Sequence, residues 1–200
     1  MNRIITIGRE FGSGGRELGL RLSQKLGIAY YDQEIITEIS KRTELSEQYI
    51  RKMSEKKPVF SFPLHIGRSF HYMQNSPWDL NLSIFREQSS IIREMAQKSD
   101  CVIVGLCADD ILQEMNPLRV FVYADMEAKL TRCRQRSASD EQMTDREILS
   151  NIRRIDKSRS EYYGLYTGKV WGDKRSYDLC INTTEISMER ACALLAEFFQ

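Results

Sequence analysis

The sequence predicts an α/β fold built on a parallel β-sheet. Short apolar runs alternate with helix-period segments along most of its 200 residues, which is typical of parallel strands joined by right-handed helical crossovers. A glycine cluster, with glycines at positions 8, 12, 14 and 15, directly follows the first run. Strand, glycine turn and helix in this order direct several backbone N–H groups toward one point that attracts phosphate oxygens. We therefore expect a protein that handles a nucleotide or a phosphate.

Five segments are predicted as strands and six as helices. The strands are expected at Arg3–Ile7, Ala29–Tyr31, Cys101–Gly105, Arg119–Ala124 and Tyr177–Asn182. The helices are expected around Gly15–Leu26, Gln33–Arg42, Ile84–Gln97, Met126–Gln135, Asp145–Ser160 and Ser187–Phe199. Ligand sites of such sheets form at the carboxyl ends of the strands. These ends are predicted at Gly8, Asp32, Gly105 and Asp125.

The stretch from about 43 to 81 departs from the alternation. It holds a charged, helix-like part, Ser46–Lys57, followed by an irregular aromatic part that begins at Pro58 and includes Trp78. It is too long for a connecting loop, so we expect an appended lobe. Its aromatic side chains either pack a small core or stack on a substrate base, and we favour packing.

The segment from Arg132 to Gly168 also departs from the alternation, and it is rich in arginine. Arg132 and Arg136 lie four residues apart on one helix, and Arg153, Asp156 and Arg159 recur every three residues on another. Like charges stacked four apart repel each other unless something bridges them. Polyphosphate between such segments makes the arrangement favourable. We expect a lid that closes over phosphates, and the alternative is a solvated face paired with nearby acidic residues.

The glycine cluster differs from a standard phosphate-binding loop, G-x-x-x-x-G-K-[ST]. Gly15 stands where the lysine belongs, Arg16 follows it, and Glu17 stands where the hydroxyl residue belongs. Two other interpretations compete. One is a glycine-rich turn without a ligand. The other is a dinucleotide-binding turn with Asp32 as the ribose-binding acid, but no tyrosine has the lysine four residues later that short-chain dehydrogenases use.

Composition narrows the function classes further. A hydrophobic share of 42% suits one substantial core, and a net charge of +1 argues against a general nucleic-acid binder. No apolar run is long enough to span a bilayer, and the chain starts almost directly with a strand, so we expect no membrane partner, no signal peptide and a cytoplasmic location. The five cysteines contain no Cys-x-x-Cys pair, which favours reduced thiols and no structural metal. The sequence is compatible with a homo-oligomer but does not indicate one.

The chain resembles the cytidylate kinase-like family, a branch of the P-loop nucleoside monophosphate kinases. The resemblance lies in GREFGSGGRELG, LSQKLGIAYYDQEII, CVIVGLCADDIL, VFVYADMEAKLTRCRQR and DKSRSEYYGLYTGKVWGDKRSYDLCINTT. It implies a single three-layer kinase-like domain with a five-stranded parallel sheet. The core would comprise residues 1–42, 82–131 and 169–200, with a helical monophosphate-binding lobe at about 43–81 and an arginine-rich lid at about 132–168.

The resemblance also implies roles for individual residues. Gly12 to Arg16 would hold the donor β-phosphate, and Asp32 would lie at the edge of the acceptor site. Arg132 and Arg136 would face the donor nucleotide, whereas Asp156 and Arg159 match an Asp-x-x-Arg that bridges acceptor ribose and phosphates. Two arginines of the family pattern are absent: Glu38 ends the acceptor motif after Asp32, and a Gly-Arg-Asp segment reads Gly105-Leu106-Cys107.

The expected activity is transfer of the γ-phosphate of ATP to a small acceptor such as CMP. Such a transfer needs aligned phosphates and cations against the charge of the equatorial oxygens. The candidate donor-binding residues are Gly12, Ser13, Gly14, Gly15, Arg16 and Glu17, the candidate catalytic arginines are Arg16, Arg132, Arg136, Arg153 and Arg159, and the candidate acceptor-binding residues are Asp32, Asp156 and Arg159. Mg²⁺ would be held mainly by phosphates and water, with Ser13, Glu17 or Asp32 as outer ligands. The alternative is a sensor or interaction protein that binds nucleotide without catalysis.

Overall fold

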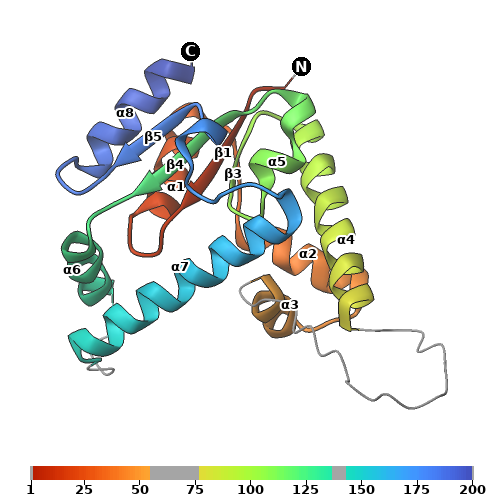
Figure 1. Ribbon diagram of the computed structural model, residues 1–200. Coiled ribbons are helices and arrows are strands. Elements are labelled where there is room, and N and C mark those ends of the chain that lie inside the picture. Colours follow the sequence, from red (N-terminus) through yellow and green to blue (C-terminus); the bar gives the residue numbers. More distant parts are fainter. Residues whose placement is uncertain (1, 55–76, 137–142, 200) are drawn as a thin grey trace.

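The computed structural model describes residues 2–54, 77–136 and 143–199, which form a five-stranded parallel sheet with helices on both faces (Figure 1). The strand order is β2-β3-β1-β4-β5. The strands are β1 (Ile4–Arg9), β2 (Ala29–Tyr31), β3 (Cys101–Val104), β4 (Leu118–Tyr123) and β5 (Leu179–Asn182). The predicted α/β class with a parallel sheet is confirmed, and β1 lies at its centre.

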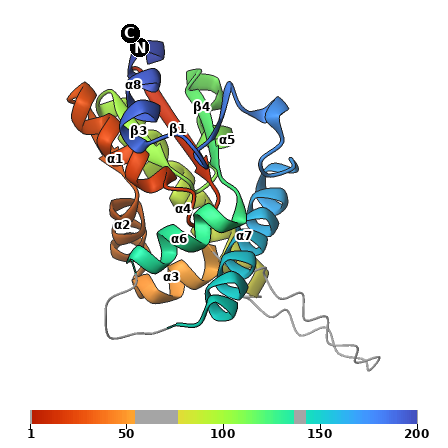
Figure 2. The ribbon, with the colours of Figure 1, turned by 90° about the vertical axis from the view of Figure 1, so that its left-hand side faces the viewer.

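Helices form two layers around this sheet and cross one of its ends. They are α1 (Gly15–Leu26), α2 (Gln33–Thr43), α3 (Glu47–Ser54), α4 (Pro77–Lys98), α5 (Ala108–Ile111), α6 (Met126–Arg136), α7 (Asp145–Thr167) and α8 (Met188–Phe199). Figures 1 and 2 show α1 and α8 on one face of the sheet and α2, α4 and α5 on the other. Helix α7 runs past the carboxyl ends of the strands, where ligand sites of such sheets form.

Each face of the sheet has its own apolar core because neighbouring residues of a strand point to opposite faces. Ile5 and Ile7 of β1 are fully buried in the core shared with α1 and α8. Ile4 of β1 and Ile103 of β3 belong to the other core, which α2, α4 and the end of α7 complete. Burial of both faces explains the nearly continuous apolar strands of the sequence.

A buried amide side chain connects α4 to two segments near the carboxyl ends of the strands. Gln88 is fully buried, and its Nε2 donates to the carbonyl of Leu106 at 2.9 Å. The Tyr162 hydroxyl of α7 donates to Gln88 Oε1 at 3.0 Å. The turn that Gln88 supports is left-handed, since φ is 56° at Leu106 and 55° at Cys107. Gln88 therefore fixes the end of α7 and the turn after β3 to one another.

Several element boundaries differ from the sequence-based prediction. Helix α7 continues to Thr167 rather than ending near Ser160, because Tyr162 and Tyr163 pack into a core. Helix α4 begins at Pro77 rather than Ile84. Ser187 precedes α8, and its hydroxyl accepts from the Arg190 amide at 3.3 Å. The short helix α5 was not predicted.

The expected lobe at about 43–81 is described in part. It contributes α3 and the first turns of α4, whereas the aromatic stretch from Pro58 to Tyr72 lies outside the described residues. Within the described ranges, no helix combines the length and the apolar character needed to cross a bilayer.

Candidate functional site

The loop between β1 and α1 presents an open helix N-terminus. Helix α1 starts at Gly15 after Gly14, and no side chain caps it. Among the described residues, none accepts a hydrogen bond from the backbone amides of Gly14 to Glu17. The first amides of a helix lack intrahelical partners and carry the positive end of its dipole. This turn is therefore suited to bind an anion such as phosphate.

Contacts inside the protein hold the loop in this shape. The backbone of Gly14 has a φ of 84°, and a Cβ there would lie 2.9 Å from the Met188 sulfur, so that a larger residue meets both strain and a clash. The buried Ser13 hydroxyl donates to the Glu10 carbonyl at 2.8 Å. The buried Thr183 hydroxyl, just after β5, donates to the Ser13 carbonyl at 2.7 Å. The loop is thus positioned before any ligand binds.

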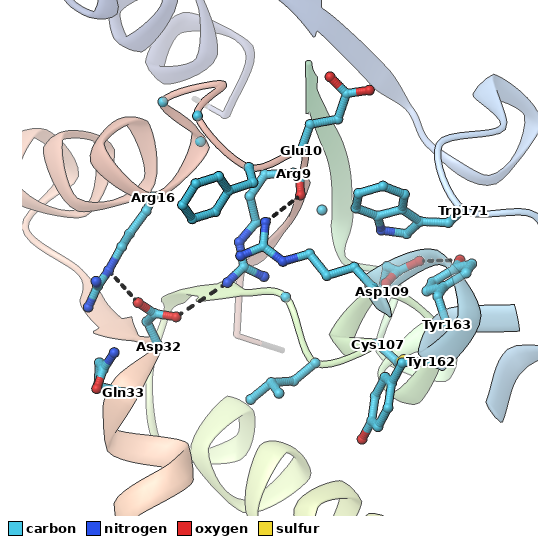
Figure 3. A pocket seen from close by; sticks show the side chains of 18 of the residues that line it. Arg9, Glu10, Arg16, Asp32, Gln33, Cys107, Asp109, Tyr162, Tyr163 and Trp171 are labelled. Carbon is cyan, nitrogen blue, oxygen red and sulfur yellow. Dashed lines mark hydrogen bonds and ion pairs between the residues drawn. The ribbon is translucent and has the colours of Figure 1, made fainter. Parts of the chain in front are cut away.

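A cavity of about 400 Å³ lies beside this loop at the carboxyl ends of the strands (Figure 3). Its walls are the glycine loop, the residues after β2 and β3, and the second half of α7 with the segment that follows it. The charged side chains that line it are Arg9, Glu10, Arg16, Asp32, Asp109, Arg136 and Arg159. Helix α7 supplies Tyr162 and Tyr163, and Trp171 follows it. The loop amides and a set of arginines therefore border one common space.

Asp32 is the centre of an ion-pair cluster on one side of the cavity. It precedes α2, and its carboxylate lies 2.6 Å from Arg16 Nε and 3.7 Å from an Arg9 Nη atom. Figure 3 shows Arg9 and Arg16 approaching Asp32 from the same side as the loop. The side chains of Asp32 and Arg9 are only 12% and 18% exposed, whereas that of Arg16 is 56% exposed. Arg9 is thus the cation of this cluster that is more removed from water.

Arg159 and Arg136 reach the same cavity from two different helices. Arg159 of α7 donates to the Arg9 carbonyl at 3.2 Å, and its guanidinium lies 5.7 Å from the centre of the Phe11 ring. Arg136, at the end of α6, pairs with Glu17 of α1. Two segments that are far apart in the sequence, the glycine loop and the arginine-rich stretch, therefore contribute to one site.

Other predicted site residues do not line the cavity. Arg132 donates to the Thr183 carbonyl, and burial followed by repulsion from Arg136 lowers the pKa of its guanidinium. Arg153 is exposed on α7. Ser13 and Glu17 belong to the loop and the first turn of α1 but are not part of the cavity wall.

Asp156 and a buried lysine hold the loop after β1 through polar contacts. Its carboxylate accepts from the Phe11 amide at 2.6 Å and from Lys129 Nζ at 3.1 Å. Lys129, on α6, is almost fully buried and also lies 2.5 Å from the Glu10 carboxylate. This trio joins α6 and α7 to the loop, so the observed contacts of Asp156 are with protein groups.

A buried carboxyl group lies in the cavity wall beyond the turn after β3. Asp109 is 8% exposed and accepts from the Tyr163 hydroxyl at 2.7 Å. Burial raises the pKa of Asp109, and the hydrogen bond from Tyr163 offsets only part of this rise. Burial and the neighbouring Asp109 also raise the pKa of Tyr163 above its ordinary value. The group therefore tends toward its neutral form more than an exposed aspartate does.

Sequence reasoning missed Arg9, Lys129 and Asp109 as parts of the site. Arg9 directly precedes the loop, but no local pattern indicates where its side chain points. Lys129 lies three residues before Arg132, one helical turn away on the same face, which is a signal that was available. Asp109 follows a strand that was predicted, so its position at a carboxyl strand end could have identified it.

The described residues around the cavity hold no preformed group of ligands for Mg²⁺. Among the described residues, no three or more His, Cys, Asp or Glu side chains gather as a metal-binding group. The Ser13 hydroxyl donates to a carbonyl, and Glu17 pairs with Arg21 and Arg136. Asp32 is the candidate ligand that lines the cavity. This set fits an ion carried by phosphates and water, with Asp32 as an outer contact.

Comparisons with known proteins agree with the fold described above. An uncharacterized protein from Eubacterium ventriosum ATCC 27560 has 26% sequence identity and a TM-score of 0.72, with 99% of this chain and 98% of that chain covered. A shikimate kinase from Bacteroides thetaiotaomicron has 16% identity and a TM-score of 0.58, with coverages of 98% and 97%. A sugar kinase from Janibacter sp. HTCC2649 has 12% identity and a TM-score of 0.54, with coverages of 98% and 94%.

The two kinase structures share the fold of this protein, a nucleotide-binding phosphotransferase fold of the P-loop type. No curated protein sequence matches the chain. The sequence pattern of the cytidylate kinase-like family matches residues 4–185, which is most of the chain. The protein therefore belongs to the cytidylate kinase-like family.

Proposed function

We propose that this protein transfers the γ-phosphoryl group of ATP to a small acceptor, with CMP as the first acceptor to test. The observation that carries the proposal is the open N-terminus of α1 beside a cavity lined by Arg9, Arg16, Arg136 and Arg159. Phosphoryl transfer depends on such positioning and on positive charge around the transferred group. Membership of the family supports the same reaction class.

The position of each group in the cavity determines its role in the transfer. The amides from Gly14 to Glu17 hold the donor β-phosphate, as helix N-termini do. Arg16, on the first turn of α1, stands in for the lysine of a standard loop. Arg136 and Arg159 approach from α6 and α7 and stabilise the charge on the transferred group. The bond from the γ-phosphorus to its bridging oxygen breaks, and a bond from the acceptor oxygen to that phosphorus forms, with ADP as the leaving group.

Bound Mg²⁺ would neutralise charge on the donor β- and γ-oxygens. The protein's part is to leave room for the hydrated ion and to orient the phosphates. Asp32 is positioned for an outer contact once a ligand competes for Arg16. The same carboxylate keeps Arg16 and Arg9 beside the cavity before a ligand binds.

The first experiment measures ADP formation from Mg-ATP with a panel of nucleoside monophosphates. Arg159→Ala should lower turnover at least tenfold because a cation at the transferred group is lost. Its thermal unfolding midpoint should stay near wild type. Arg154→Ala is the matched control, since Arg154 is exposed on the same helix and does not line the cavity. Wild-type turnover in Arg159→Ala with every acceptor would refute this assignment.

A second candidate function is a nucleotide sensor on a kinase fold. The observation that favours it is that Arg16 and Glu17 both pair with other side chains of the protein. Arg16→Ala separates the two functions. In an enzyme it lowers turnover more than ATP affinity, whereas in a sensor only the affinity can change. ATP-induced thermal stabilisation without turnover on the whole acceptor panel would favour the sensor.

A further inference from the structure

Arg136 lines the cavity, but the carboxylate that pairs with it does not. Arg136 is the last residue of α6 and part of the cavity wall. Its partner, Glu17, belongs to the first turn of α1 and is not part of that wall. This ion pair joins the end of α6 to the helix whose N-terminus is open. Glu17 therefore holds a cation that borders the ligand space.

The pair between Glu17 and Arg136 is accessible to water. The side chain of Arg136 is 50% exposed and that of Glu17 is 32% exposed. Ion pairs at such positions are weak because water screens both charges. A terminal phosphate carries nearly two negative charges against one for a carboxylate, so it is the stronger partner for a guanidinium. A phosphate at the start of α1 can therefore take Arg136 from Glu17.

Glu17 keeps a second cation when Arg136 changes its partner. Arg21, one turn further along α1, lies 2.8 Å from the Glu17 carboxylate and also pairs with Glu189 of α8. The first turn of α1 stabilises the same carboxylate, since a negative charge near a helix N-terminus is favourable. The exchange thus leaves Glu17 paired and ionised, and its cost is limited to the contact with Arg136.

Arg136 needs a nearby anion because a second guanidinium lies beside it. Arg132 is one turn earlier on α6, and like charges at this spacing repel each other. Burial and repulsion from Arg136 lower the pKa of Arg132, and the Glu17 carboxylate acts in the opposite direction. Arg132 donates to the Thr183 carbonyl, so Arg136 is the one that can turn to a ligand. A bound phosphate then supplies the negative charge that Glu17 supplied before.

We propose that Glu17 is an internal competitor of the donor phosphates, which holds Arg136 until a phosphate at the start of α1 replaces it as the partner of that guanidinium. This inference rests on the proposed phosphotransferase function and assigns a regulation to the donor side of its site. The carboxylate stands where a standard phosphate-binding loop has a hydroxyl residue. There it lowers the affinity for phosphate and holds α6 against α1 before the nucleotide arrives.

The first experiment measures the affinity for ADP by calorimetry, with adenosine as the ligand that lacks phosphates. Glu17→Gln should bind ADP about 3- to 10-fold more tightly than wild type, because the competing charge is lost while the side chain keeps its size. Its affinity for adenosine should not change. Arg136→Gln should bind ADP about 10-fold more weakly, since the guanidinium that the phosphate takes over is missing.

Glu189→Gln is the matched control for the loss of one negative charge. Glu189 is 69% exposed, and its ion pair in the described part of the chain is with Arg21 rather than Arg136. This variant should bind ADP within about twofold of wild type, because water and salt screen an exposed charge. Thermal unfolding of Glu17→Gln should occur at the wild-type temperature or slightly below it, since a favourable charge at the start of α1 is lost. Tighter binding by a variant that is no more stable does not arise from better folding.

Hydrogen exchange at the end of α6 separates competition for Arg136 from simple repulsion between Glu17 and phosphate. Without ligand, the last turn of α6 should exchange its amide protons faster in Glu17→Gln than in wild type, and ADP should slow this exchange again. Arg136→Gln removes the same contact from its other side, so it should exchange faster there with or without ADP. Glu189→Gln should exchange as wild type does.

Four outcomes would overturn the role of Glu17. They are an ADP affinity in Glu17→Gln that is no higher than in wild type, an ADP affinity that Arg136→Gln leaves unchanged, exchange at the end of α6 that Glu17→Gln does not alter, and no detectable ADP binding by either wild type or Glu17→Gln. The proposed function fails differently. A protein that binds ADP as expected here, but forms none from Mg-ATP with any acceptor, would be a nucleotide sensor in which Glu17 still has this role.

Discussion

Lys129 provides the sharpest test of how the glycine loop between β1 and α1 is held. Its ammonium group is buried between the carboxylates of Glu10 and Asp156, at 2.5 and 3.1 Å. Lys129→Met keeps a stem of similar length, which preserves packing against the loop, but removes the charge that both carboxylates share. The two carboxylates then lie close together without a cation between them.

The expected cost follows from the burial of the three groups. Removing one member of a buried ion pair costs about 3–5 kcal/mol. The carboxylate side chains keep some contact with water, at 27% and 17% exposure, so we expect about 3 kcal/mol, the lower end of that range. For a chain of this size, such a loss lowers the melting temperature by about 6–12 °C.

The assay is thermal and urea unfolding of Lys129→Met beside a control on the same helix. Arg134→Met breaks an ion pair with Asp145 in which both side chains are about half exposed, and exposed pairs contribute about 0–1 kcal/mol. Adding Asp156→Asn to Lys129→Met should recover part of the loss, since it removes one unpaired charge. If Lys129→Met and Arg134→Met unfold at the same temperature, the trio does not stabilise the loop as described.

Two further changes test other parts of the site. Asp109→Asn keeps an oxygen that accepts from Tyr163 but removes ionisation. Because burial raises the pKa of Asp109 in the folded state, wild-type stability should fall as the pH rises from about 4 through that pKa. Urea unfolding at several pH values should show this fall reduced in the variant, and an unchanged pH profile would contradict the reasoning. Thr183→Val removes the buried hydroxyl that donates to the Ser13 carbonyl, so it should lower the free energy of unfolding by about 1–3 kcal/mol. A variant as stable as wild type in urea would show that this hydrogen bond does not anchor the loop.

The sequence predicted the sheet and the loop because both depend on local patterns. Strands buried on both faces appear as continuous apolar runs, and the start of α1 follows from the glycines before Gly15. The start of α4 and the end of α7 were predicted less well, because packing rather than helix period decides where they stop. The left-handed turn at Leu106 and Cys107 has no local signal, since neither residue favours a positive φ.

The cavity depends on contacts between residues far apart in the sequence, which local patterns do not reveal. The orientation of Arg9 requires an empty space at Gly105, almost a hundred residues later. A spaced row of arginines indicated a phosphate lid, but spacing alone does not tell which side chains line the cavity. Arg136 and Arg159 line it, whereas Arg132 contacts Thr183 and Arg153 is exposed.

Gln88 supports the turn after β3, although it lies on a helix away from the cavity. A left-handed conformation at a residue other than glycine costs about 1–2 kcal/mol, and Leu106 and Cys107 adopt it in succession. Such a turn persists only where its neighbours oppose relaxation, and Gln88 does so from α4, a helix of which no described residue lines the cavity. The buried amide of Gln88 thus helps to determine the shape of the cavity. A mutational survey restricted to the residues that line the cavity would miss it.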